Sequence, residues 1–84
     1  MKKIFISDKC PDCRRIFDLI DEKKDNFDFI NITESMANLK EFLRYRDKLE
    51  EFDIIRENNK VGIPVMIDEN NKAVFLTEKE IENL

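Results

Sequence analysis

The chain has 84 residues, of which 42% are hydrophobic and 40% charged, and its formal net charge is −4. A chain of this length forms one small domain with a thin core, which we expect to span residues 1–84. The acidic balance argues against nucleic-acid binding, and no apolar run is long enough to predict a transmembrane helix.

The first half of the chain has the pattern of a strand, a helix and a second strand. Residues 2–7 contain a continuous apolar run, which is typical of a strand that is buried on both faces. A helix should begin near Cys10 and end at 23–26, and residues 27–32 alternate as a second strand. This order predicts two parallel strands joined by a right-handed crossover.

A long second helix is predicted over about 35–50, capped by Thr33 or Ser35. The side chains at its helical spacing should pack in the core, and they are Met36, Leu39, Phe42 and Leu43. A short helical piece should follow at 53–58. The charged stretch 44–60 is interpreted as a solvated surface, and the alternative is a segment that docks a partner protein.

The end of the chain predicts a hairpin followed by a helix. Residues 65–67 and 73–76 have the composition of strands, and the polar run 68–71 between them is a turn. Thr77 and Glu80 have the spacing of a capping box at the start of a terminal helix. The predicted order is therefore β-α-β-α-(α)-β-β-α.

Both cysteines lie in the motif Cys10-Pro11-Asp12-Cys13, at the start of the first helix. Proline is tolerated in a first turn, and a helix N-terminus stabilises a thiolate, which is the attacking species in thiol–disulfide exchange. Lys9 should favour the Cys10 thiolate and neighbouring carboxylates should oppose it. We therefore expect Cys10 to attack a substrate disulfide and Cys13, one turn inside, to resolve the mixed disulfide.

Other uses of this cysteine pair remain open at this point. Two free cysteines can be small core residues, or form an inert structural disulfide. They can also bind a metal or an iron–sulfur cluster, although a chain with two Cys and no His would need a second copy to supply four ligands. No signal peptide is recognisable, so we expect a cytoplasmic protein, where such motifs are more often catalytic or metal-binding.

Ile63-Pro64 lies just before the third predicted strand. Proline at the start of a strand can be an ordinary edge residue, but after a strand–helix–strand unit with C-x-x-C it strengthens the redox interpretation. With these motifs, nearly the whole chain resembles the glutaredoxin family of the thioredoxin-like superfamily. The resemblance implies an α/β fold with a four-stranded mixed sheet flanked by helices. It also implies a cis peptide before Pro64, with the backbone of Ile63 free to pair with a peptide or glutathione.

The resemblance further implies a thiol–disulfide oxidoreductase that reduces protein disulfides or glutathione mixed disulfides. The reductant would be glutathione, as a co-substrate, or a thioredoxin-reductase-type flavoprotein. We expect a monomer with no bound cofactor or metal and no nucleic-acid or membrane partner. The substrate-binding residues would be Lys9, Pro11, Asp12, Ile63, Pro64, Thr77 and Glu78.

Three positions depart from the family pattern. Asp12 stands where many glutaredoxins have an aromatic residue, and Ser7 stands where a basic residue is common. The family's Gly-Gly and acidic residue after the last strand are replaced by 75–78, Phe-Leu-Thr-Glu. Without these glycines, a close backbone approach to a glutathione carboxylate is harder. A further alternative is a redox-sensing domain whose disulfide forms reversibly without turnover.

Overall fold

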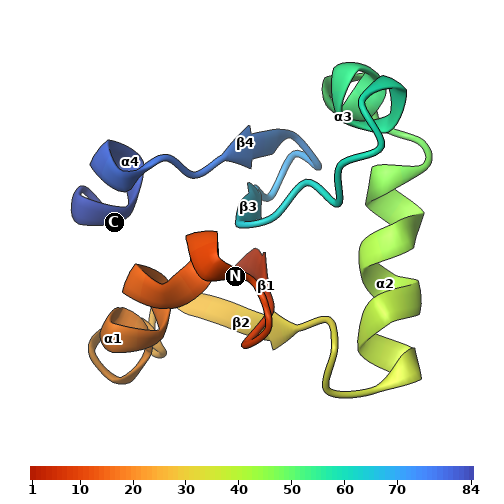
Figure 1. Ribbon diagram of the computed structural model, residues 1–84. Coiled ribbons are helices and arrows are strands. Elements are labelled where there is room, and N and C mark those ends of the chain that lie inside the picture. Colours follow the sequence, from red (N-terminus) through yellow and green to blue (C-terminus); the bar gives the residue numbers. More distant parts are fainter.

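The computed structural model describes residues 1–84, and its centre is a four-stranded sheet in the order β2-β1-β3-β4 (Figure 1). Strand β1 (Lys2–Ile6) pairs in parallel with β2 (Phe27–Asn31) and antiparallel with β3 (Val65–Ile67). Strand β4 (Ala73–Phe75) completes an antiparallel hairpin with β3. The predicted mixed sheet is confirmed.

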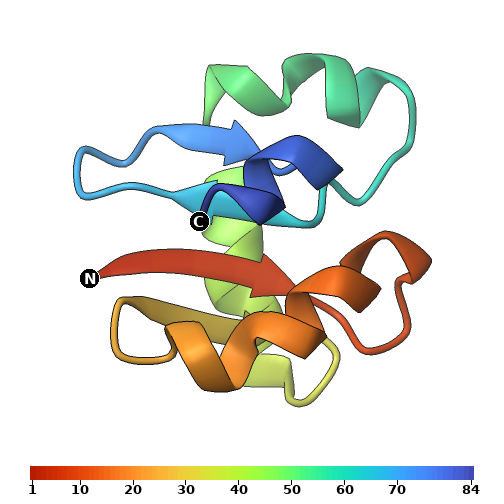
Figure 2. The same cartoon turned by 90° about the vertical axis from the view of Figure 1, so that its left-hand side faces the viewer.

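Helices cover both faces of this sheet. Helices α1 (Arg14–Lys23) and α4 (Glu78–Glu82) lie on one face, and α2 (Met36–Arg46) and α3 (Asp53–Glu57) lie on the other (Figures 1 and 2). This double cover explains the continuous apolar run of β1. None of the helices combines the length and the hydrophobicity that are needed to cross a bilayer.

The sheet separates two clusters of buried side chains. The cluster under α2 and α3 is rich in aromatic rings, and its buried members are Phe5, Ile30, Ile32, Phe42, Phe52, Val65 and Ile67. The cluster under α1 and α4 is aliphatic except for one thiol, and its buried members are Ile4, Ile6, Cys13, Ile16, Leu76 and Ile81. The second cysteine of the motif is therefore a core residue.

Local capping rules account for the starts of two helices. The Ser35 hydroxyl accepts a hydrogen bond from the Asn38 N–H at 3.1 Å and caps α2, so of the two predicted caps Ser35 is correct. The predicted capping box of Thr77 and Glu80 is present at α4. Thr33, the alternative cap, instead bonds side chains of the loop that leads to the motif.

The second helix is shorter than the prediction of 35–50. It ends at Arg46, and a 3₁₀ helix (Glu50–Phe52) leads into α3. The Phe52 ring of this 3₁₀ helix is fully buried in the aromatic-rich cluster. Met36 was predicted to face the core, but it lies in the first turn of α2 and is 67% exposed.

Candidate active site

The cysteine motif occupies the turn that joins β1 to α1. Cys10 is the N-cap of a 3₁₀ helix (Pro11–Cys13) that continues directly into α1. The Cys10 N–H donates to the Ser7 carbonyl at 3.2 Å, and the Cys13 N–H donates to the Cys10 carbonyl at 3.1 Å. Because Pro11 lacks an N–H, it leaves no unsatisfied donor at this first helical position. The motif is therefore a continuation of the helix N-terminus.

The two thiols have different environments, and both are free. Cys10 is half-buried, whereas the Cys13 side chain is fully buried in the aliphatic cluster. Burial raises the pKa of the Cys13 thiol to about 12, and the adjacent Cys10 and Asp12 act in the same direction. Cys13 is therefore a protonated thiol at neutral pH, and Cys10 is the sulfur that a substrate can reach.

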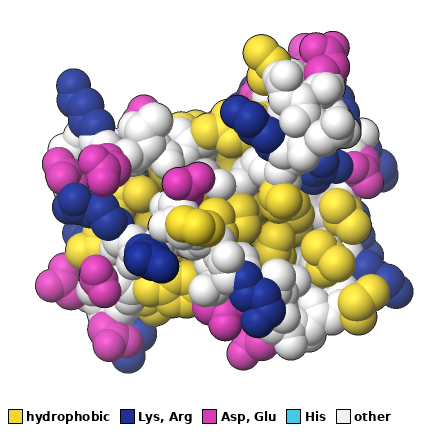
Figure 3. Space-filling model, viewed as in Figure 1, with side chains coloured by type: hydrophobic (Ala, Val, Ile, Leu, Met, Phe, Trp, Pro, Cys, Tyr) yellow, Lys and Arg dark blue, Asp and Glu magenta, His cyan; other side chains and the backbone are white.

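Cys10 opens into a groove of about 1020 Å³ at the carboxyl end of β1. This Cys10 groove brings together every residue predicted to contact substrate, namely Lys9, Pro11, Asp12, Ile63, Pro64, Thr77 and Glu78. Cys13 does not line it. On this face of the molecule, hydrophobic side chains gather towards the middle and charged ones lie mainly at the margin (Figure 3).

The stretch Val61–Pro64 forms one wall of the Cys10 groove. The peptide bond between Ile63 and Pro64 is cis, as the family resemblance implies. The N–H and C=O groups of Ile63 make no hydrogen bond within the protein. The Ile63 side chain packs against both core clusters, which holds this backbone in place beside Cys10.

The start of α4 lines the groove next to Pro64, because the Leu76 N–H donates to the Pro64 carbonyl at 3.0 Å. The predicted substrate contacts Thr77 and Glu78 lie here, but the Thr77 N–H already donates to the Glu80 carboxylate at 3.1 Å. The Glu78 carboxylate is exposed and lies 4.0 Å from Arg15. A carboxylate of a ligand would therefore meet two glutamates at this helix start, with one backbone donor already used.

A polar network supports the loop before Cys10. The hydroxyl groups of Ser7 and Thr33 are 2.7 Å apart, and Thr33 donates to the Asp8 carboxylate at 3.0 Å. These bonds from Thr33 and from Asn31 lower the pKa of the Asp8 carboxyl, so it stays ionised at neutral pH. The network ties the loop to the end of β2.

Some groove residues were not singled out from the sequence as site residues. They are Ile32, Thr33, Ile55, Lys60 and Ile81. They come from different elements, so no local motif relates them to the cysteines. Only the position of Lys60 just before Val61-Gly62-Ile63-Pro64 gave a signal.

A family model described as Glutaredoxin matches residues 3–70, which include the motif and the Val61–Pro64 wall. The chain belongs to the glutaredoxin family. A protein of Haemophilus influenzae (strain ATCC 51907 / DSM 11121 / KW20 / Rd), described as "Uncharacterized protein", is 34% identical over 72 residues, which cover 86% of this chain and 84% of that protein. No solved structure gives a significant match.

Within this glutaredoxin-family structure, no three Cys, His, Asp or Glu side chains are grouped so that they could hold a metal ion. A site shared by two copies, the alternative considered above, would take both thiols of each copy to reach four ligands. One thiol of each pair, Cys13, is fully buried in its own core. Such a site would therefore need the motif to open.

The contrast between the two thiols predicts selective alkylation. At pH 7.5, iodoacetamide should modify Cys10 and leave Cys13 unmodified, because only about one Cys13 in thirty thousand is a thiolate and its side chain is buried. Selectivity should persist at pH 10 and disappear in urea, where both residues react. Peptide mass spectrometry measures both sites, and equal labelling of the native protein would contradict the assignment.

Proposed function

We propose that the protein is a thiol–disulfide oxidoreductase of the glutaredoxin type. The observation that supports this most directly is the pairing of an accessible Cys10 with a buried, protonated Cys13 one turn beneath it. Cys10 is open to a substrate in the groove, and Cys13 is shielded until a mixed disulfide has formed. A purely structural disulfide would not need a substrate groove at one of its sulfurs.

The reaction proceeds in two exchanges. The Cys10 thiolate attacks one sulfur of the substrate disulfide, the S–S bond breaks, and the other substrate sulfur leaves as a thiolate. That leaving thiolate takes the proton of Cys13. The Cys13 thiolate then attacks Cys10, the second substrate sulfur leaves, and a Cys10–Cys13 disulfide remains. Two electrons have passed to the substrate.

The charge of the Cys10 thiolate affects how easily Cys13 loses its proton before the second exchange. Its charge is one cause of the raised pKa of Cys13, although burial is the larger cause. This contribution is lost once Cys10 is bonded to the substrate sulfur, because that sulfur is no longer charged. Deprotonation of Cys13 is therefore easier after the first exchange than before it.

Protein disulfides and glutathione mixed disulfides are the proposed substrates, and two molecules of glutathione or a thioredoxin-reductase-type flavoprotein reduce the protein again. The free backbone groups of Ile63 support pairing with an extended peptide. Lys9 in the groove offers positive charge to an anionic substrate, whereas the charge of Arg15 is already paired with Glu78 and Glu82. The glutamates near Thr77 favour a substrate without a carboxylate at that end.

A redox titration coupled to a turnover assay tests this function. We expect the Cys10–Cys13 pair to oxidise reversibly by two electrons, with a midpoint in the range of about −180 to −270 mV that such dithiol proteins cover. Reduction of a glutathionylated peptide and of a peptide disulfide should then be measured with each reductant. A pair that never cycles, or that cycles without turning over any substrate, would contradict the proposal.

A further inference from the structure

The stretch 60–63 has little backbone support of its own, although it forms part of the groove wall. The Lys60 N–H donates to the Ile55 carbonyl at 3.0 Å. After this bond, the backbone groups of Val61, Gly62 and Ile63 make no hydrogen bond to other backbone groups. Backbone bonding resumes at Pro64, whose carbonyl accepts from the Leu76 N–H at 3.0 Å. Something other than secondary structure must therefore fix this part of the wall.

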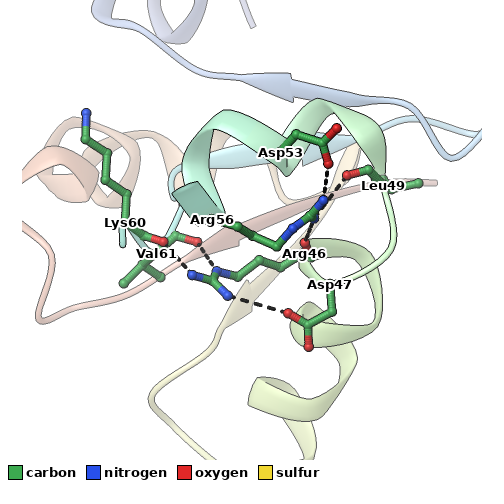
Figure 4. Close-up of polar contacts among 7 residues, drawn as sticks. All are labelled: Arg46, Asp47, Leu49, Asp53, Arg56, Lys60 and Val61. Atoms are coloured by element: carbon green, nitrogen blue, oxygen red, sulfur yellow. Dashed lines mark hydrogen bonds and ion pairs between the residues drawn. The ribbon is translucent and has the colours of Figure 1, made fainter. Parts of the chain in front are cut away.

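Arg46, the last residue of α2, supplies that support. Its guanidinium donates from Nη2 to the Lys60 carbonyl at 2.7 Å and from Nε to the Val61 carbonyl at 3.1 Å. Figure 4 shows both carbonyl oxygens turned toward the guanidinium, while the Lys60 side chain extends away from it. One planar group thus fixes two successive peptide units.

Arg46 is itself held firmly. The Arg56 guanidinium of α3 donates to the backbone carbonyls of Arg46 and Leu49, which lie at and beyond the end of α2, where helix carbonyls lack intrahelical partners (Figure 4). Arg56 also pairs with Asp53, and Arg46 pairs with Asp47 at 3.5 Å. The Arg46 side chain is only 23% exposed. The end of α2, helix α3 and the groove wall are therefore one connected unit.

We propose that Arg46 is a positioning residue for the Cys10 groove. It touches neither cysteine and is not among the residues that line the groove. By fixing the carbonyls of Lys60 and Val61, it sets the position of Ile63, whose N–H and C=O groups are free and which lines the groove. The inference rests on the proposed function and names a determinant of substrate binding for that same site.

Three variants separate positioning from charge and from general stability. Arg46→Met removes both hydrogen bonds, and Arg46→Lys keeps the charge but cannot reproduce the planar pair of donors. Arg44→Met is the matched control, because Arg44 is exposed on the same helix and makes no hydrogen bond or ion pair. Thermal melting shows whether each variant is folded at the assay temperature, and Arg46→Lys keeps the test available if Arg46→Met does not fold.

We expect Arg46→Met to raise KM for a peptide disulfide at least about fivefold, since a displaced binding wall weakens substrate alignment. The value of kcat should stay within about twofold, because the thiols are unchanged. Arg46→Lys should fall between, and Arg44→Met should match the wild type. The rate of Cys10 alkylation should be equal in all four proteins, which shows that the motif is undisturbed.

Amide hydrogen exchange gives a readout that is independent of activity. Exchange at Val61, Gly62 and Ile63 should be faster in Arg46→Met than in Arg44→Met, whereas exchange in β1 should be equal. If folded Arg46→Met and Arg44→Met share the same KM and the same exchange, the proposal is overturned. If the wild type turns over no substrate, the proposed function fails, and the positioning role for its substrate fails with it. If the wild type is active but KM and exchange are both unchanged in Arg46→Met, only the role of Arg46 is refuted.

Discussion

Cys10→Ser should lower the turnover of a disulfide substrate at least about a thousandfold, because no other thiol lines the groove. Cys13→Ala should behave differently. It retains the attacking thiol, so the first exchange proceeds, but the mixed disulfide is no longer resolved from within the protein. The two variants therefore separate attack from resolution.

Mass spectrometry of the intact protein distinguishes these outcomes. After incubation with a peptide disulfide, Cys13→Ala should gain the mass of one peptide, Cys10→Ser should gain none, and the wild type should lose two hydrogens. Alanine is preferred over serine at position 13 because a hydroxyl buried without a partner costs about 1–3 kcal/mol. An adduct on Cys13 in the Cys10→Ser protein, formed at the wild-type rate, would reverse the two roles.

The parts of the fold that sequence reasoning predicted correctly follow local rules. The apolar run of β1, the capping box of Thr77 and Glu80 and the polar turn of the hairpin each depend on neighbouring residues. The cysteine motif is equally local, because C-x-x-C at a helix start needs only the turn geometry. These signals placed the motif and Ile63-Pro64 in one site, and all the predicted substrate contacts do line one groove.

The features that were mispredicted or missed depend on contacts between distant segments. Met36 has helical spacing, but it is the first residue of α2 and is exposed, whereas Phe42 in the middle of the same helix is buried. Arg46 and Arg56 lie in a charged stretch that was interpreted as solvated, yet both bind backbone carbonyls of other segments. The spacing of residues in the sequence does not show which arginine of a charged stretch will donate a hydrogen bond to a backbone carbonyl of another segment.

Gly62→Ala should be the most destabilising single methyl addition in the groove wall. Gly62 has a φ of +97°, a conformation that L residues rarely adopt. An added Cβ would also lie 2.9 Å from Cε1 of Phe52 and 3.0 Å from Cγ2 of Ile55. The Phe52 ring cannot move away easily, because it is fully buried and packs edge-on against Phe75 with ring centroids 5.0 Å apart.

Backbone strain and overpacking each cost about 1–3 kcal/mol, so we expect Gly62→Ala to lose about 2–6 kcal/mol of unfolding free energy. This is a large share of the roughly 5–15 kcal/mol of a small domain, and urea unfolding should show a lower midpoint at constant m value. Asn71→Ala is the matched control, because Asn71 has a φ of +61° in the exposed hairpin turn. This control measures the cost of an alanine at a positive φ where the side chain is exposed rather than buried.

A double variant tests the clash itself. Phe52→Leu replaces the ring that the new methyl group would meet with a smaller side chain. Gly62→Ala should therefore lower the unfolding free energy less in a Phe52→Leu background than in the wild type. A positive coupling energy between Gly62→Ala and Phe52→Leu would show that the groove wall packs directly on the aromatic core. This contact would explain why the chain has its only glycine at position 62. Equal losses for Gly62→Ala and Asn71→Ala, with no coupling to Phe52, would show that backbone conformation alone selects glycine there.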